Sequence, residues 1–141
     1  QALEKIRRYH GSALLVDCHS MPSAAIDRNG AARADFVLGD RFGTSAASAL
    51  TDLIEDHLSG RGFRVVRNSP YAGGFITEHY GTPDTGCHAI QIEINRGLYL
   101  DERRLEKLEN FGVVQSEITL LSENLIEFMR SGRENFNLAA E

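Results

Sequence analysis

Two residues with catalytic chemistry stand near the ends of two apolar segments. The first segment begins after Gly11 and ends at His19, and the second, from Cys87 to Ile94, carries Glu93 between two isoleucines. A neutral imidazole in such a place is a good zinc ligand. A carboxylate between isoleucines needs a charge partner or a metal-bound water beside it if it is buried, and it can serve as a general base.

These residue types favour a metal-assisted hydrolase in which His19 is the candidate metal ligand and Glu93 the candidate base. Asp17 could orient the imidazole of His19 or pair elsewhere. A hydrolytic zinc ion normally has three protein ligands, and residue chemistry alone supports one of them here. For either side chain taken alone, a structural role at a strand end is the competing interpretation.

Strands of a layered α/β fold are expected to position both residues. Apolar periodicity and turn residues predict strands over 12–19, 35–38, 63–66 and 87–94, a brief extended piece at 75–77, and helices over 2–10, about 45–59 and two segments between 102 and 131. This alternation indicates a mostly parallel or mixed central sheet. Sites in parallel sheets lie at the carboxyl ends of the strands, so we expect His19 and Glu93 to lie close together.

Composition limits the classes of function. The 141 residues suit one domain, and a formal net charge of -5 would repel phosphate backbones, so nucleic acid is not expected as a partner. No apolar run is long enough to span a bilayer and no basic leader opens the chain, so we expect a soluble protein without a membrane partner. Cys18 and Cys87 stand in apolar runs and are expected to be buried, free thiols.

Four motifs occur in an order that resembles the N-formylglutamate amidohydrolase family. The resemblance extends roughly from Leu14 to Glu102, and the flanking helices fit more loosely. The segments that carry it are Val16-Asp17-Cys18-His19-Ser20-Met21-Pro22-Ser23, Asp35-Phe36-Val37-Leu38-Gly39-Asp40, Asn68-Ser69-Pro70-Tyr71-Ala72-Gly73-Gly74-Phe75-Ile76-Thr77 and Gln91-Ile92-Glu93-Ile94-Asn95-Arg96-Gly97-Leu98-Tyr99.

The resemblance implies a fold and a reaction. The family is similar to the zinc carboxypeptidases and aminoacylases, which implies three α/β/α layers around a mixed sheet and amide hydrolysis by water that zinc activates. His19 matches a metal ligand, and Glu93 matches the glutamate that moves the proton. The implied substrate is N-formyl-L-glutamate or a similar N-acyl acidic amino acid, cleaved to formate and the amino acid. A cytoplasmic location and a step in histidine degradation are also implied.

The motif that supplies the first two metal ligands in the resembling superfamily has no counterpart here. Residues 1–141 are therefore expected to be one domain that forms the carboxyl-terminal portion of the family's fold, with the other zinc ligands upstream of Gln1. Such a fragment is expected to bind zinc weakly and to be inactive alone. Of the other histidines, His57 and His79 are expected to be solvated, while His88 is either structural or lines the site.

The resemblance and the turn residues also suggest substrate contacts. Arg96 could pair with a substrate carboxylate or form an ordinary salt bridge, and the glycine-containing loop could approach the substrate or be a plain turn. The candidate substrate-binding residues are Arg96, Asn68, Tyr71, Gly73, Gly74 and Asn95, with Arg28, Arg33, Asp35 and Asp40 as further residues that could reach the pocket.

Two alternative functions remain open at this point. A related zinc acylase or carboxypeptidase-like enzyme could act on another acyl substrate, because pocket size cannot be read from sequence. An inactive domain could bind an acidic metabolite or a partner protein without hydrolysis.

Overall fold

The two segments that carry His19 and Glu93 are neighbouring parallel strands. The structure, a computed structural model, describes residues 1–24 and 34–132. The elements along the chain are α1 (Ala2–His10), β1 (Ala13–Met21), β2 (Phe36–Gly39), α2 (Ser48–Ser59), β3 (Val65–Arg67), α3 (Phe75–Tyr80), the 3-10 turn η1 (Pro83–Thr85), β4 (Cys87–Asn95), the 3-10 turn η2 (Arg96–Leu98), β5 (Leu100–Asp101), β6 (Glu106–Lys107) and α4 (Phe111–Ser131).

The main sheet is mixed, as the sequence predicts. Its strand order is β1-β4-β2-β3. β1 runs parallel to β4 and β2 runs parallel to β3, while β2 and β4 are antiparallel. The four strands therefore form two parallel pairs that point in opposite directions.

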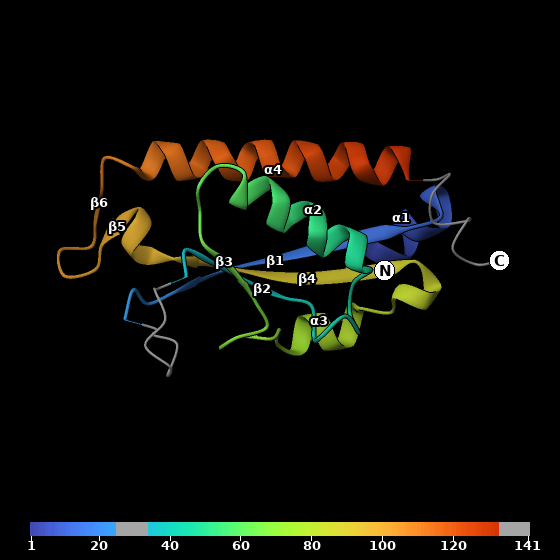
Figure 1. The fold of residues 1–141 in the computed structure, drawn as a ribbon. Helices are drawn as coiled ribbons and strands as arrows, with labels where there is room; N and C mark the ends of the chain where they lie inside the picture. Colours follow the sequence, from blue (N-terminus) through green and yellow to red (C-terminus); the bar gives the residue numbers. More distant parts are fainter. Residues whose placement is uncertain (25–33, 133–141) are drawn as a thin grey trace.

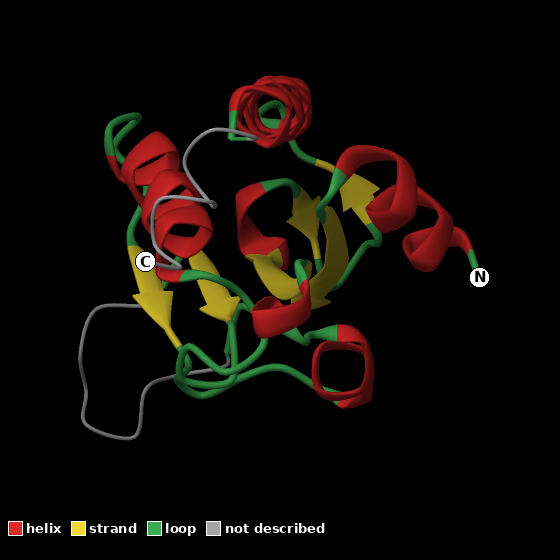
Figure 2. Ribbon diagram, turned by 90° about the vertical axis from the view of Figure 1, so that its right-hand side faces the viewer, coloured by secondary structure: helices red, strands yellow, loops and turns green. Residues whose placement is uncertain are grey.

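Helices cover both faces of this sheet. In Figure 1, α2 and α4 lie together on one side of the strands and α3 lies on the other side, while α1 flanks β1. The view along the strands in Figure 2 shows the same arrangement, with the sheet enclosed between helices. The predicted α/β/α layering is thus present in the described residues.

Alternation along β4 separates the hydrophobic core from the polar face. Ile90 and Ile92 are fully buried against α2 and α4. Since successive strand residues point to opposite faces, Gln91 and Glu93 point to the face that α3 covers. The core cluster consists of Phe36, Leu38, Ala46, Leu50, Ile54, Leu58, Ile90, Ile92, Leu121 and Leu125.

Two of the predicted elements are wrong. The piece at 75–77, expected to be extended, begins the helix α3, which is held by main-chain bonds such as Glu78 N–H to the Gly74 carbonyl at 3.1 Å. The first of the two helices expected after residue 101 is instead the short hairpin of β5 and β6. Leu105 has a φ of +58° there, which a helix cannot accommodate.

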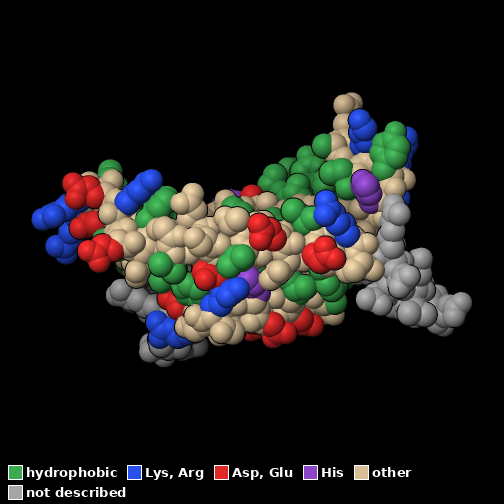
Figure 3. Space-filling model, turned by 90° about the horizontal axis from the view of Figure 1, so that it is seen from above, with side chains coloured by type: hydrophobic (Ala, Val, Ile, Leu, Met, Phe, Trp, Pro, Cys, Tyr) green, Lys and Arg blue, Asp and Glu red, His purple; other side chains and the backbone are tan. Residues whose placement is uncertain are grey.

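The expected burial of the two cysteines is also corrected. Cys18, on the edge strand β1 of the described sheet, is exposed, and Cys87 is half-buried. Both cysteines are free, as expected. On the α4 side of β1, Val16 and Cys18 border a hollow of about 720 Å³ that reaches α1 and α4. Figure 3 shows hydrophobic side chains gathered at this end of the molecule.

His57 is a further correction, because α4 packs over the side of α2 that carries it. Its side chain is only 6% exposed. The Nδ1 atom lies 2.9 Å from the side-chain amide of Asn124, and Arg61 Nε donates to its Nε2 atom at 3.3 Å. The histidine expected to face solvent therefore belongs to the contact between two helices.

None of the helices within residues 1–24 and 34–132 combines the length and the apolar character needed to cross a membrane.

Two adjacent leucines of α4 test the packing of the core. Leu121 is 2% exposed and Leu120 is 40% exposed. We expect Leu121→Ala to lower the free energy of unfolding by about 2–5 kcal/mol, because it leaves a cavity against the sheet. Leu120→Ala is the matched control, with an expected change within about 0.5 kcal/mol. Urea unfolding followed by circular dichroism measures both, and equal losses would contradict the packing described.

Candidate active site

The parallel pairing of β1 and β4 brings His19 and Glu93 together. The two residues are direct partners in the strand register, and Nδ1 of His19 lies 3.8 Å from Oε1 of Glu93. Glu93 is 6% exposed, whereas the side chain of His19 is 48% exposed. The prediction that these two side chains lie close together is confirmed.

Asp17 holds the other side of the imidazole. Its Oδ2 atom lies 3.1 Å from Nε2 of His19, two residues along the same face of β1. A carboxylate on one ring nitrogen fixes the orientation of the ring and leaves the other nitrogen directed elsewhere. In this arrangement Nδ1, the nitrogen nearer Glu93, is directed toward the candidate base.

Gln91 joins Glu93 to the loop that precedes α3. Its Nε2 donates to Oε1 of Glu93 at 2.7 Å, and its Oε1 accepts from the N–H of Gly74 at 2.9 Å. Gln91 is itself buried. The candidate base is therefore hydrogen-bonded to a side chain on its own strand, which in turn binds the candidate substrate loop.

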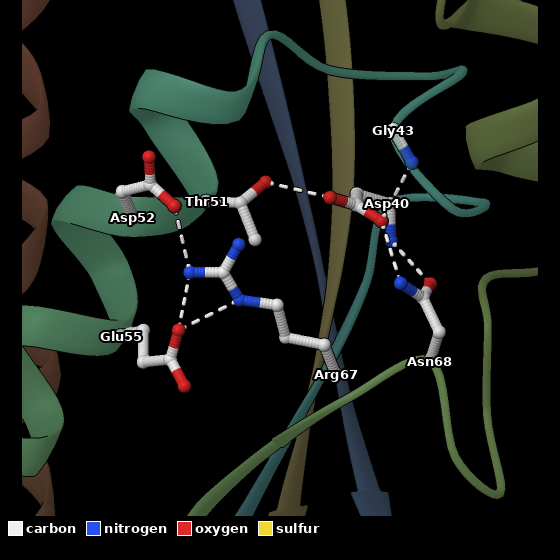
Figure 4. A network of polar contacts seen from close by, with 7 residues as sticks. All are labelled: Asp40, Gly43, Thr51, Asp52, Glu55, Arg67 and Asn68. Carbon is white, nitrogen blue, oxygen red and sulfur yellow. Dashed lines mark hydrogen bonds and ion pairs between the residues drawn. The ribbon is translucent and has the colours of Figure 1, made fainter.

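Asn68 anchors the other end of this loop. It follows β3 with a φ of +58°, and its side-chain amide donates to Oδ1 of Asp40 at 2.8 Å. Its carbonyl oxygen accepts from the main-chain N–H of Asp40 at 3.1 Å. Figure 4 shows the two residues facing each other, with Thr51 of α2 donating to the second carboxylate oxygen of Asp40.

This network holds Asp40 as a buried anion. Burial alone would raise the pKa of Asp40, but hydrogen bonds from Asn68, the Gly43 N–H and Thr51, together with the charge of Arg67, hold that pKa below its usual value. Arg67 in turn pairs with Asp52 and Glu55 of α2 (Figure 4). Asp40 and Asn68 thus fasten the ends of β2 and β3 to α2.

The middle of the loop passes close to the end of β2. A side chain at Gly39 would lie 2.5 Å from the main-chain nitrogen of Gly73, so only glycine allows this approach. Gly73 has a φ of +108°. Tyr71 is half-buried in the same loop. Of the loop candidates, Gly74 is therefore connected to Glu93 through Gln91, while Asn68 makes its bonds to Asp40.

Asn95 and Arg96 lie past Glu93 and make local contacts. Oδ1 of Asn95 accepts from the Gly97 N–H at 2.9 Å and so caps η2, while its amide donates to the Ala34 carbonyl at 3.1 Å. Nε of Arg96 lies 3.3 Å from a carboxylate oxygen of Glu102. The salt bridge that the sequence leaves open for Arg96 is present, with the guanidinium half-buried.

Among the remaining candidates, Asp35 and His88 make hydrogen bonds to groups other than His19 and Glu93. Asp35 accepts from the Arg64 N–H at 2.8 Å, while Arg28 and Arg33 lie outside the described residues. His88 is buried, which lowers its pKa, and its Nδ1 accepts from the Ala47 N–H at 3.3 Å. A neutral His88 with this bond has a structural role.

The side chains present match one part of a zinc site. An imidazole oriented by a carboxylate is the usual form of a metal-binding histidine, and His19 with Asp17 has this form. Within the described part of the chain, no three His, Cys, Asp or Glu side chains are placed to hold a metal ion together. The described residues therefore offer one candidate metal ligand and one candidate base, without a three-ligand set.

Sequence reasoning overlooked the role of Gln91. The alternation of polar and isoleucine residues in β4 already puts Gln91 on the face of Glu93, and a buried amide must find both a donor and an acceptor. This requirement could have indicated from the sequence that Gln91 binds a neighbouring group at the site. The partnership of Asp40 with Asn68 had no comparable signal, because it depends on which strand ends lie side by side.

The buried carboxylate of Asp40 gives stability a pH dependence. Because its folded-state pKa is lowered, its contribution is fully present above the unfolded value of about 4 and is lost as pH falls through the lowered value. We expect Asp40→Asn to cost about 1–3 kcal/mol at pH 7 and to flatten the decline of stability below pH 4. Urea titrations at several pH values measure this, with the exposed Asp56→Asn as control. Equal acid sensitivity of wild type and Asp40→Asn would refute the assignment.

Comparison with known proteins identifies the family. The family model described as N-formylglutamate amidohydrolase matches residues 1–100. The N-formylglutamate deformylase of Pseudomonas aeruginosa is 35% identical over 104 residues, which are 73% of this chain and 39% of that protein. The deformylase of the same name from Pseudomonas putida is 34% identical over 101 residues, covering 71% of this chain and 38% of that protein.

A solved structure agrees with the fold. The crystal structure of N-formylglutamate amidohydrolase from Ralstonia eutropha superposes with a TM-score of 0.88 at 38% identity, covering 93% of this chain and 48% of that one. The chain thus spans less than half the length of these relatives. The residues that match the family model include His19, Glu93 and the loop at 68–74. The chain belongs to the N-formylglutamate amidohydrolase family.

Proposed function

We propose that this chain provides the base and one metal ligand for hydrolysis of the amide bond of N-formyl-L-glutamate, giving formate and glutamate. The observation that carries the proposal is the register pair of His19 and Glu93, 3.8 Å apart on adjacent parallel strands of a chain from this family. A buried carboxylate beside a metal-directed imidazole suits a base that acts on water.

Glu93 has two tasks in this reaction. It takes a proton from the attacking water as the water oxygen forms a bond to the formyl carbon. It then gives the proton to the amide nitrogen as the carbon–nitrogen bond breaks, so that formate and the free amine leave. Its burial beside Gln91 and His19 keeps the carboxylate in one orientation for both transfers.

His19 is the proposed zinc ligand of this chain, through Nδ1, while Asp17 orients the ring from Nε2. Zinc, when bound, would polarise the formyl carbonyl and lower the pKa of a water toward about 7. The other ligands are proposed to come from outside residues 1–141. The half-exposed side chain of His19 at the edge strand β1 supports a site that further residues complete.

The proposed substrate contacts come from two segments of the chain. One is the loop with Asn68, Tyr71, Gly73 and Gly74, which is joined to Glu93 through the bond from Gly74 to Gln91, and the other is Asn95 and Arg96, which follow Glu93 along the chain. Arg96 is the proposed partner of a substrate carboxylate, which would compete with Glu102 for the guanidinium. A cytoplasmic location and a step in histidine degradation belong to the same proposal and rest on the motif resemblance.

Substrate choice separates this proposal from its alternatives. The complete gene product should hydrolyse N-formylglutamate faster than the acetyl and succinyl analogues, measured by release of free glutamate. Preference for a larger acyl group would favour a related zinc acylase. Calorimetric binding of N-formylglutamate without hydrolysis, in the presence of zinc, would favour a binding domain.

Two substitutions in the complete gene product test the assigned roles. Glu93→Gln should keep zinc and lose turnover by about 100- to 10,000-fold, because the base is removed while the metal ligand remains. His19→Ala should lose zinc itself. Metal content by atomic emission and steady-state rates measure both. Normal turnover in Glu93→Gln would overturn the role of the base, and full zinc content in His19→Ala would overturn that of the ligand.

Residues 1–141 alone provide a separate test of the ligand set. We expect calorimetric titration with zinc to show no tight stoichiometric binding and the fragment to lack deformylase activity, because one imidazole cannot replace three ligands. The complete gene product is the positive control under the same buffer conditions. Tight one-to-one binding by the fragment would show that its own residues form the site.

A further inference from the structure

We propose that Gln91 is a positioning residue for Glu93, and that it couples the orientation of the base to the position of the loop at Gly74. The inference rests on the proposed function of Glu93. Two hydrogen bonds carry it: Gln91 Nε2 to Glu93 Oε1 at 2.7 Å, and Gly74 N–H to Gln91 Oε1 at 2.9 Å.

The chemistry of the partners fixes the direction of the Gln91 amide. The main-chain N–H of Gly74 can only donate, so it must face the amide oxygen. An ionised carboxylate can only accept, so Glu93 must face the amide nitrogen. In the reversed orientation, the Gln91 NH₂ group would face the Gly74 N–H and the Gln91 oxygen would face the Glu93 carboxylate. Both buried contacts would then be repulsive, so the observed orientation is strongly preferred.

Burial raises the cost of losing either of the two hydrogen bonds of Gln91. Gln91 and Glu93 are each 6% exposed, so little water is available to replace a lost bond. Oε1 of Glu93 is also the oxygen that lies 3.8 Å from Nδ1 of His19. Holding Oε1 sets the plane of the carboxylate relative to the imidazole, and hence the direction in which the base can accept a proton.

The second bond connects this geometry to the substrate loop. Gly74 is the residue before α3, and the start of the loop is fastened by Asn68 to Asp40. Movement of the loop at Gly74 would pull on the amide of Gln91 and turn the carboxylate of Glu93. The orientation of the Glu93 carboxylate therefore depends on the position of the loop at Gly74.

Gln91→Met tests the inference in the complete zinc-loaded gene product, because methionine keeps the length of the side chain without its hydrogen bonds. We expect kcat to fall roughly 10- to 100-fold while KM and zinc content stay within about 2-fold of wild type. Ser45→Ala is the structural control. It removes a buried hydrogen bond to the main chain of β4, from Ser45 Oγ to the Ala89 carbonyl, without contact to Glu93.

Two further measurements do not depend on activity. In Gln91→Met, the amide of Gly74 should exchange with solvent at least about 10-fold faster, since its acceptor is gone. In Glu93→Gln, the side-chain amide resonances of Gln91 should shift in the NMR spectrum, while those of Asn124 should stay in place.

The outcomes separate this inference from the proposed function. If wild type fails to hydrolyse N-formylglutamate, the proposed function fails, and the exchange and NMR measurements still decide whether the coupling exists. Unchanged Gly74 exchange would overturn the coupling. In an active enzyme, an unchanged kcat, or a fall that matches Ser45→Ala in every readout, would overturn the positioning role.

Discussion

The parallel register between β1 and β4 is the constraint on which the site depends. In parallel strands, paired residues point to the same face of the sheet, so the pairs Asp17 with Gln91 and His19 with Glu93 form one polar patch beneath α3. A slip of one residue would send Glu93 into the apolar core between the sheet and α2. Ile90 and Ile92 prevent that slip, because they are buried on the opposite face.

The opposite direction of β2 and β3 gives the site its second support. Because β2 is antiparallel to β4, Gly39 at the end of β2 lies opposite Gln91, two residues before Glu93 on β4. The loop that follows β3 therefore passes next to Gln91. The hydrogen bonds between Asp40 and Asn68 fix the start of this loop. The polar network of α2 and the polar patch of β4 are parts of one frame, joined through the loop that ends at Gly74.

The sequence predicted the strands of the site better than its surroundings. The continuous apolar run before His19 and the alternation around Glu93 are strong local signals, and both segments formed strands. The alternation in β4 gave the expected faces, whereas the end of β1 is more exposed than its apolar run indicates. The predictions of an extended piece at 75–77 and of a helix directly after residue 101 were wrong. Short segments have weak periodicity, and their structure depends on local caps and turns. The burial of His57 depended on where α4 lies across α2, which no pattern within either helix specifies.

The edge position of β1 determines which neighbours His19 can have. Within the described residues, β1 has a strand on one side only, and that strand delivers Glu93. Its other edge still presents main-chain donors and acceptors to whatever comes beside it. A strand that paired there would lie about 4.8 Å away, and its side chains would flank Asp17 and His19 as closely as Gln91 and Glu93 do. The surroundings of His19 thus depend on strand pairing as much as on side-chain chemistry.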